Sequence, residues 1–195
     1  DYIRRSPKLR DNTLVVLMSD NGPEPGAGSA APLRGSKGTL FEGGIREPLI
    51  VWGPGFVPAA KAGSVNETSV LSSVDLAASL LRLAGAQPPP GARPDGADMA
   101  DTLTGKATAS RREPLFWKRP PDRPGPPRNR HPDLAVREGD WKLLVDEDGS
   151  RARLYDLGKD PGETTDLAAA QPEVVERLKK RVLAWDATLP GAPAP

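Results

Sequence analysis

Two short apolar runs stand out in the first half of the chain. Residues 13–18 read TLVVLM and residues 48–52 read PLIVW, and each run stops at a turn sequence, SDNGP or GPG. Continuous apolar runs rich in β-branched residues are typical of strands buried on both faces of a parallel sheet. The pattern therefore predicts two buried strands in this region.

A helix is predicted after the second strand. Ser72 and Asp75 have the S-x-x-D spacing of a capping box, and apolar residues then recur at helical spacing up to Ala84. Gly85 and Pro88 are typical of a helix end. The order strand, loop, strand, helix indicates an α/β domain.

The second half of the chain has a different pattern. Short apolar runs predict the strands of an antiparallel meander, at residues 115–117, 134–137, 141–145 and 153–157. A helix is predicted over residues 172–187, where Pro172 suits the first helical position and the apolar residues share one face. The segment 118–132, rich in proline and basic residues, is predicted to be an exposed irregular loop.

This change of pattern predicts two domains. We expect residues 1–105 to form the carboxyl-terminal portion of a large α/β domain. Residues 106–195 would form a small subdomain, the antiparallel meander plus the helix 172–187.

Composition narrows the classes of function. Lys and Arg number 27 against 26 for Asp and Glu, so bulk charge gives no case for binding nucleic acid or a membrane surface. The chain has no cysteine, which excludes a cysteine nucleophile or thiolate metal ligand within it. No apolar run approaches the about 20 residues that a membrane-spanning helix needs. Because the chain begins at Asp1 in what reads as mid-helix, we expect a fragment with an upstream part.

The first candidate site follows the first strand. Asp20 and Asn21 offer a carboxylate and an amide oxygen at the carboxyl end of a predicted sheet strand, where ligands bind in open α/β folds. Such hard oxygens suit Ca²⁺ or Mg²⁺, although Ca²⁺ takes 6–8 of them. Taken alone, Asp-Asn-Gly reads equally well as ordinary turn chemistry.

The second candidate is Lys37, within RGSKGT. Flanking glycines let backbone N–H groups approach an anion, and the ammonium group is a compact charge suited to a sulfate or phosphate oxygen. It is not a Walker loop, because that motif needs Ser or Thr after the lysine and Gly38 stands there. A solvated surface lysine is the alternative interpretation.

Seven stretches, in order, resemble the carboxyl-terminal part of a formylglycine-dependent sulfatase of the alkaline-phosphatase-like superfamily. They are TLVVLMSDNG, PLRGSKGTLFEGGIREPLIVWGPG, SSVDLAASLLRLAGAQPP, DGADMADTLTG, REPLFW, AVREGDWKLL and LYDLGKDPGETTDLAAAQPEVVERL. The second and the last are the most specific. The resemblance implies an alkaline-phosphatase-like sandwich followed by a small antiparallel sheet with one carboxyl-terminal helix.

The resemblance also implies roles for particular residues. Asp20 and Asn21 match the pair that binds the active-site metal, usually Ca²⁺, and Lys37 matches the lysine that contacts the sulfate group. Glu42 and Glu163 match positions that we interpret as structural. The family's nucleophile is a formylglycine made from Cys or Ser in a C/S-x-P-x-R box, which this chain lacks. We expect it and the remaining metal ligands upstream of residue 1.

The function expected from the resemblance is metal-dependent hydrolysis of a sulfate ester, by attack of a hydrated aldehyde oxygen on sulfur. The substrate would be a sulfated small molecule or saccharide, and the family resemblance favours a periplasmic or secreted protein. Two alternatives stay open: a truncated chain without activity of its own, and a phosphate or phosphonate ester hydrolase of the same superfamily.

Overall fold

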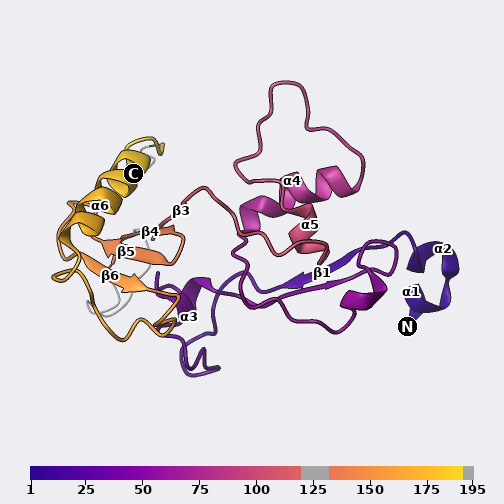
Figure 1. The fold of residues 1–195 in the computed structure, drawn as a ribbon, viewed down its shortest axis with the longest axis horizontal. Coiled ribbons are helices and arrows are strands. Elements are labelled where there is room, and N and C mark those ends of the chain that lie inside the picture. The colour runs from indigo at the N-terminus through magenta and orange to yellow at the C-terminus, as the bar shows by residue number, and fades with distance from the viewer. Residues whose placement is uncertain (120–131, 191–195) are drawn as a thin grey trace. The chain divides into compact units, whose positions relative to one another are not determined.

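The computed structural model describes residues 1–119 and 132–190, which divide into two compact units. The first unit comprises Asp1–Met18 and Pro48–Arg112, and the second comprises Ser19–Glu47 and the described residues from Glu113 onward (Figure 1). The segment after the first strand thus folds with the end of the chain. The predicted domains 1–105 and 106–195 stay a prediction, and the predicted loop 118–132 lies almost wholly outside the described residues.

The first unit contains two short helices, a strand pair and a helical layer. Its elements are α1 (Tyr2–Arg5), α2 (Pro7–Arg10), β1 (Val15–Met18), β2 (Leu49–Trp52), the short 3₁₀ helix Ala59–Lys61, α4 (Ser73–Leu83) and α5 (Ala100–Leu103). The predicted capping box of α4 is present, because the Ser72 N–H donates to Asp75 Oδ2 at 2.9 Å. Asp75 also accepts from the Ala97 N–H at 2.8 Å and pairs with Arg111, so this buried carboxylate ties three segments together.

The strand pair differs from the prediction of a buried parallel sheet. β1 and β2 run antiparallel, with Val15 opposite Trp52 and Met18 opposite Leu49. They form a sheet of two strands, and Leu17 and Ile50 are 61% and 58% exposed. Burial on both faces requires covering elements and further strands, and the described residues supply neither to this pair.

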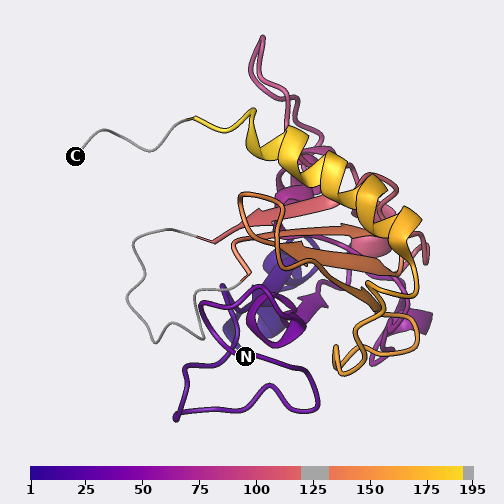
Figure 2. The ribbon, with the colours of Figure 1, turned by 90° about the vertical axis from the view of Figure 1, so that its left-hand side faces the viewer.

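The second unit is built on the predicted meander. β3 (Leu115–Lys118), β4 (Leu134–Glu138), β5 (Trp141–Val145) and β6 (Arg153–Asp156) pair in that order, each antiparallel to the next. α6 (Pro172–Asp186) lies across one face of this sheet (Figure 2). Its observed bounds agree with the predicted helix to within one residue.

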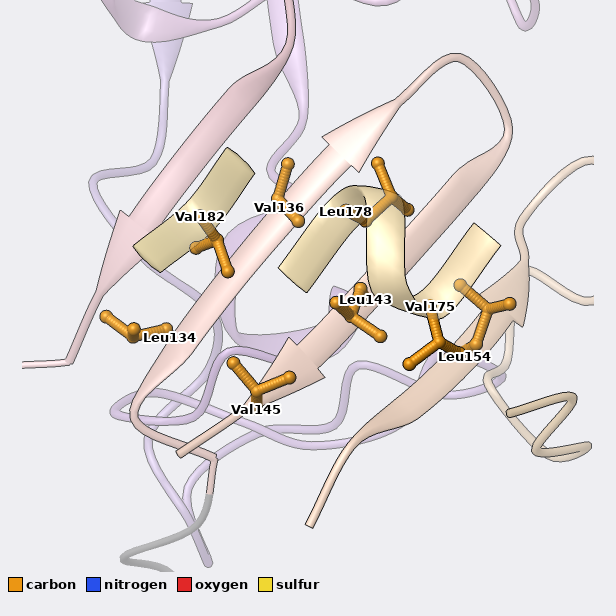
Figure 3. Packing of buried hydrophobic residues seen from close by; sticks show 8 residues of the cluster. All are labelled: Leu134, Val136, Leu143, Val145, Leu154, Val175, Leu178 and Val182. Carbon is orange, nitrogen blue, oxygen red and sulfur yellow. The ribbon is translucent and has the colours of Figure 1, made fainter. Parts of the chain in front are cut away.

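The main core lies between α6 and that face. Apolar side chains from the helix and from alternate strand positions meet there: Leu134, Val136, Leu143, Val145, Leu154, Val175, Leu178 and Val182 (Figure 3). The alternation follows from the two-residue period of strands and the 3.6-residue period of the helix.

Within the described residues, no helix is long and apolar enough to cross a membrane.

The opposite face of the sheet is covered by residues 34–42, the lysine segment, which carries Lys37. Leu40 and Phe41 pack there against Ala135, Leu144 and Tyr155. The short helix α3 (Glu42–Ile45) follows directly. The meander is therefore the central layer of the second unit, with α6 on one side and the lysine segment on the other.

A buried ion cluster fastens that segment to the sheet. Lys142 of β5 is fully buried, and its Nζ lies 2.8 Å from Glu42 Oε1 and 2.9 Å from Glu163 Oε1. Glu163 Oε2 in turn accepts the Glu42 backbone N–H at 2.6 Å. Lys142 thus joins two carboxylates that are far apart in the sequence.

Arg34 makes a second attachment at the start of the segment. Its guanidinium group lies 4.1 Å from the centre of the Phe41 ring and donates to Tyr155 Oη and to the Glu163 carbonyl, both at 3.1 Å. The guanidinium group is planar, so stacking on a ring and donating two hydrogen bonds holds it in one orientation. The lysine segment is therefore anchored at Arg34 and at Glu42, on either side of Lys37.

We predict that Lys142→Met destabilises the folded chain by about 3 to 5 kcal/mol. Removing the ammonium group from between Glu42 and Glu163 leaves Glu163 without its charged partner and leaves Glu42 with only the longer pairs to Arg137 and Arg46, at 3.8 and 3.9 Å, which is the costly way to break a buried ion pair. Urea unfolding followed by ellipticity measures the change. The triple variant with Glu42→Gln and Glu163→Gln should recover much of the loss, and an unchanged midpoint for Lys142→Met would contradict the role of the cluster.

A pH-dependent term is also expected from Glu163. Burial raises the pKa of this carboxyl, against the opposing effect of Lys142. The folded chain therefore holds the proton more tightly than the unfolded chain, whose glutamate pKa is about 4.3. This contribution to stability is full below that pH and declines as the pH rises through the raised pKa. Glu163→Gln should remove the decline in unfolding free energy, whereas Glu176→Gln on α6 should keep it; equal pH profiles for the two variants would refute the assignment.

Candidate functional site

Asp20 and Asn21 form the turn that follows β1. The Ser19 hydroxyl donates to the Asn21 carbonyl at 2.9 Å, and Asn21 Nδ2 donates to the Gly22 carbonyl at 3.0 Å. The turn interpretation of Asp-Asn-Gly is therefore correct as far as the backbone is concerned. It leaves the exposed Asp20 carboxylate without a hydrogen bond from any described residue, so turn and site are compatible.

Gly22 brings this turn against α3. Its N–H donates to the Gly44 carbonyl at 3.1 Å, and a Cβ built at position 22 would lie only 2.0 Å from the Gly43 carbonyl oxygen. Only glycine permits this approach of two backbones. The DNG sequence at residues 20–22 and the EGG sequence at residues 42–44 are thus in direct backbone contact.

Lys37 lies beside the same turn. Its backbone N–H donates to the Pro23 carbonyl at 3.0 Å, and its Nζ lies 3.1 Å from Glu24 Oε2. The side chain is about one-third exposed, so the ammonium group is reachable from solvent. The structure therefore joins the Lys37 backbone to Pro23, two residues after Asn21, and it joins the Asp20-Asn21-Gly22 turn to α3 through the Gly22–Gly44 hydrogen bond.

The flanking glycines act differently from the expectation. Gly35 and Gly38 have φ values of +89° and +86°, so they shape a tight loop. The N–H groups of Ser36 and Thr39 are used inside that loop, on Thr39 Oγ1 and the Ser36 carbonyl. The Lys37 N–H is also occupied, so these three backbone N–H groups are not turned toward a ligand.

Glu47 is a polar residue that the sequence analysis missed. Its Oε1 is buried without a hydrogen-bond partner, and burial raises the pKa of this carboxyl, with a further contribution from the negative charge of Asp20. The local sequence Arg46-Glu47-Pro48 contains no signal that would distinguish a partly buried carboxylate from one on the surface. Its proximity to Asp20 arises because the Gly22–Gly44 contact folds the two segments together.

These groups fit part of a cation site. Asp20 supplies a carboxylate and Asn21 an amide carbonyl, both of the hard-oxygen type that Ca²⁺ prefers. The unpartnered Glu47 oxygen adds negative charge near Asp20, which a cation would relieve. No group of three or more His, Cys, Asp or Glu side chains that could hold a metal ion is found in the described part of the chain, at this site or away from it.

Comparisons with known proteins agree with this reading of the motifs. A family model described as Sulfatase matches residues 5–86. The chain is 34% identical to human arylsulfatase A, over 88% of this chain and 37% of that protein. It is 30% identical to an N-acetylgalactosamine-6-O-sulfatase of Bacteroides thetaiotaomicron, over 90% of this chain and 36% of that protein.

Solved structures give the same result for the fold. The crystal structure of Ps i-CgsB in complex with k-i-k-neocarrahexaose matches 91% of this chain with a TM-score of 0.73 and 27% identity, and the match covers 37% of that chain. The predicted fold class, the carboxyl-terminal portion of an alkaline-phosphatase-like α/β sandwich followed by a small antiparallel sheet and a helix, is confirmed. The chain thus spans somewhat more than a third of the length of the relatives it matches, and its similarity throughout is to sulfatases.

Proposed function

We propose that this chain is part of an enzyme that hydrolyses sulfate esters, and that it contributes Asp20, Asn21 and Lys37 to the active site. The observation that carries the proposal is that the Lys37 backbone is bonded to Pro23, two residues after Asn21, while its ammonium group is reachable from solvent. Two backbone hydrogen bonds hold the segments together, and the anchors at Arg34 and Glu42 hold the lysine segment to the sheet. Similarity to sulfatases supports the reaction class.

The residues of this chain have separate tasks in the proposal. Lys37 places a fixed positive charge where the sulfate oxygens gain negative charge in the transition state, which is the most productive place for such a charge. Asp20 and Asn21 hold a divalent cation, Ca²⁺ by family resemblance, through their hard oxygens. A cation bound there would supply Lewis-acid polarisation, and the nucleophile would be the formylglycine that the family resemblance implies, for which this chain has no C/S-x-P-x-R box.

The proposed substrate is a sulfated small molecule or saccharide. Two observations support a saccharide: one relative is named for a sulfated amino sugar, and one structural neighbour was solved with a carrageenan-type oligosaccharide. The 195-residue chain contains no cysteine and no C/S-x-P-x-R box. We therefore expect the isolated chain, incubated with an aryl sulfate and Ca²⁺, to show no hydrolysis above background.

The metal role predicts the effect of Asp20→Ala. In a polypeptide that joins this chain to the formylglycine box, the variant should bind Ca²⁺ at least tenfold more weakly, because a charged oxygen ligand is lost. Isothermal titration calorimetry measures the binding. Asp95→Ala, which removes another exposed carboxylate, is the matched control and should bind Ca²⁺ as the parent protein does. Equal Ca²⁺ affinity in both variants would remove Asp20 from the site.

The charge role predicts a different result for Lys37→Ala. Turnover of an aryl sulfate should fall by about 10² to 10³, as for the loss of one preorganised donor to a developing negative charge. Ca²⁺ affinity should stay near that of the parent protein, which separates this effect from that of Asp20→Ala. Lys8→Ala, at an exposed position of α2, controls for loss of a surface charge. Parent-like turnover in Lys37→Ala would sink the assignment.

A further inference from the structure

Glu24 is the charged partner of Lys37, and the proposed reaction gives it no task. Its Oε2 lies 3.1 Å from Lys37 Nζ, so an anion that approaches the ammonium group also approaches this carboxylate. The pairing is not a chance encounter of two free side chains, because the Lys37 N–H is bonded to the Pro23 carbonyl, one residue before Glu24.

The backbone around Glu24 has little freedom to move the carboxylate away. Pro23 and Pro25 flank it, and the proline ring fixes φ at both positions. Pro25 also bridges to Gly28, and a Cβ at Gly28 would lie 2.8 Å from Pro23 Cβ, so the two sides of this loop are in contact. Glu24 thus places a negative charge 3.1 Å from the ammonium group, on a backbone that the flanking prolines restrict.

A fixed negative charge acts on a ligand in proportion to the charge of that ligand. The attraction of the ammonium group and the repulsion of the carboxylate partly cancel. Glu24 therefore repels a singly charged anion weakly, and it repels a doubly charged anion with about twice that energy. Because Glu24 is 61% exposed, solvent and salt screen the repulsion, and the effect per unit charge is modest.

The three ester classes of this superfamily differ in that charge. A sulfate monoester and a phosphonate monoester each carry one negative charge at neutral pH. A phosphate monoester carries close to two, since its second pKa is near 6. We propose that Glu24 is a specificity-determining residue that selects singly charged esters, sulfate or phosphonate, against doubly charged phosphate monoesters. This inference rests on the proposed anion-binding role of Lys37.

The test uses three ligands that share one leaving group: 4-nitrophenyl sulfate, 4-nitrophenyl methylphosphonate and 4-nitrophenyl phosphate. Their dissociation constants for the 195-residue chain are measured at pH 7.5 and low ionic strength by NMR titration of ¹⁵N-lysine amides. Binding, rather than turnover, is the readout, so no nucleophile is required. Glu24→Gln keeps the shape of the side chain and removes its charge.

We expect Glu24→Gln to tighten binding of the two singly charged esters about threefold and of the phosphate about tenfold, because the second charge doubles the repulsive energy that is removed. The matched control is Glu176→Gln, which removes the carboxylate from another exposed Glu–Lys pair, with Lys179 on α6. It should leave all three constants unchanged.

The failures of the two proposals are distinguishable. If Lys37→Ala binds all three ligands as the parent chain does, the anion site itself is wrong, and both the proposed function and this inference fall. If binding depends on Lys37 but Glu24→Gln shifts all three ligands equally, or weakens them, this inference alone falls. It also falls if the phosphonate follows the phosphate instead of the sulfate, because selection would then depend on the central atom and not on charge.

Discussion

The second unit depends on one buried ammonium group. Lys142 lies on the face of β5 opposite α6, fully buried between Glu42 and Glu163. A charge in that place is costly unless it is paired on more than one side, and here each carboxylate comes from a different part of the chain. The cluster consequently fixes the lysine segment and the loop after β6 on the same sheet. Such a device contributes more to the uniqueness of the arrangement than to its net stability.

The proposed site is a consequence of that anchoring. Once Glu42 is fixed, α3 presents the Gly43 and Gly44 carbonyl groups, and the Asp20-Asn21-Gly22 turn packs on them. The Pro23 carbonyl, which directly follows this turn, accepts a hydrogen bond from the Lys37 backbone N–H. The oxygens proposed to bind a cation and the ammonium group proposed to bind an anion are thereby carried on neighbouring backbone segments. Glu24 lies beside Lys37, and Glu47 lies close enough to Asp20 for the negative charge of Asp20 to raise its pKa.

The strand pair of the first unit shows where local pattern is insufficient. The apolar runs at 13–18 and 48–52 indicated strands correctly, and β1 and β2 form there. The same runs indicated burial on both faces of a parallel sheet, whereas the pair is antiparallel with Leu17 and Ile50 largely exposed. A run of β-branched residues specifies an extended backbone through local sterics, but direction of pairing and burial depend on neighbours that the run does not encode.

The sequence by itself determined the elements and the chemistry. The capping box placed α4, the apolar alternation placed the meander, and Pro172 placed the start of α6, because each depends on contacts within a few residues. The motifs also selected Asp20, Asn21 and Lys37. Only the tertiary structure decided that Lys142 is buried between two carboxylates, that Glu24 pairs with Lys37 and that Glu47 lies near Asp20. Those relations join residues across turns and across about a hundred positions, and a charged side chain has no local signature that tells a buried partner from a solvated one.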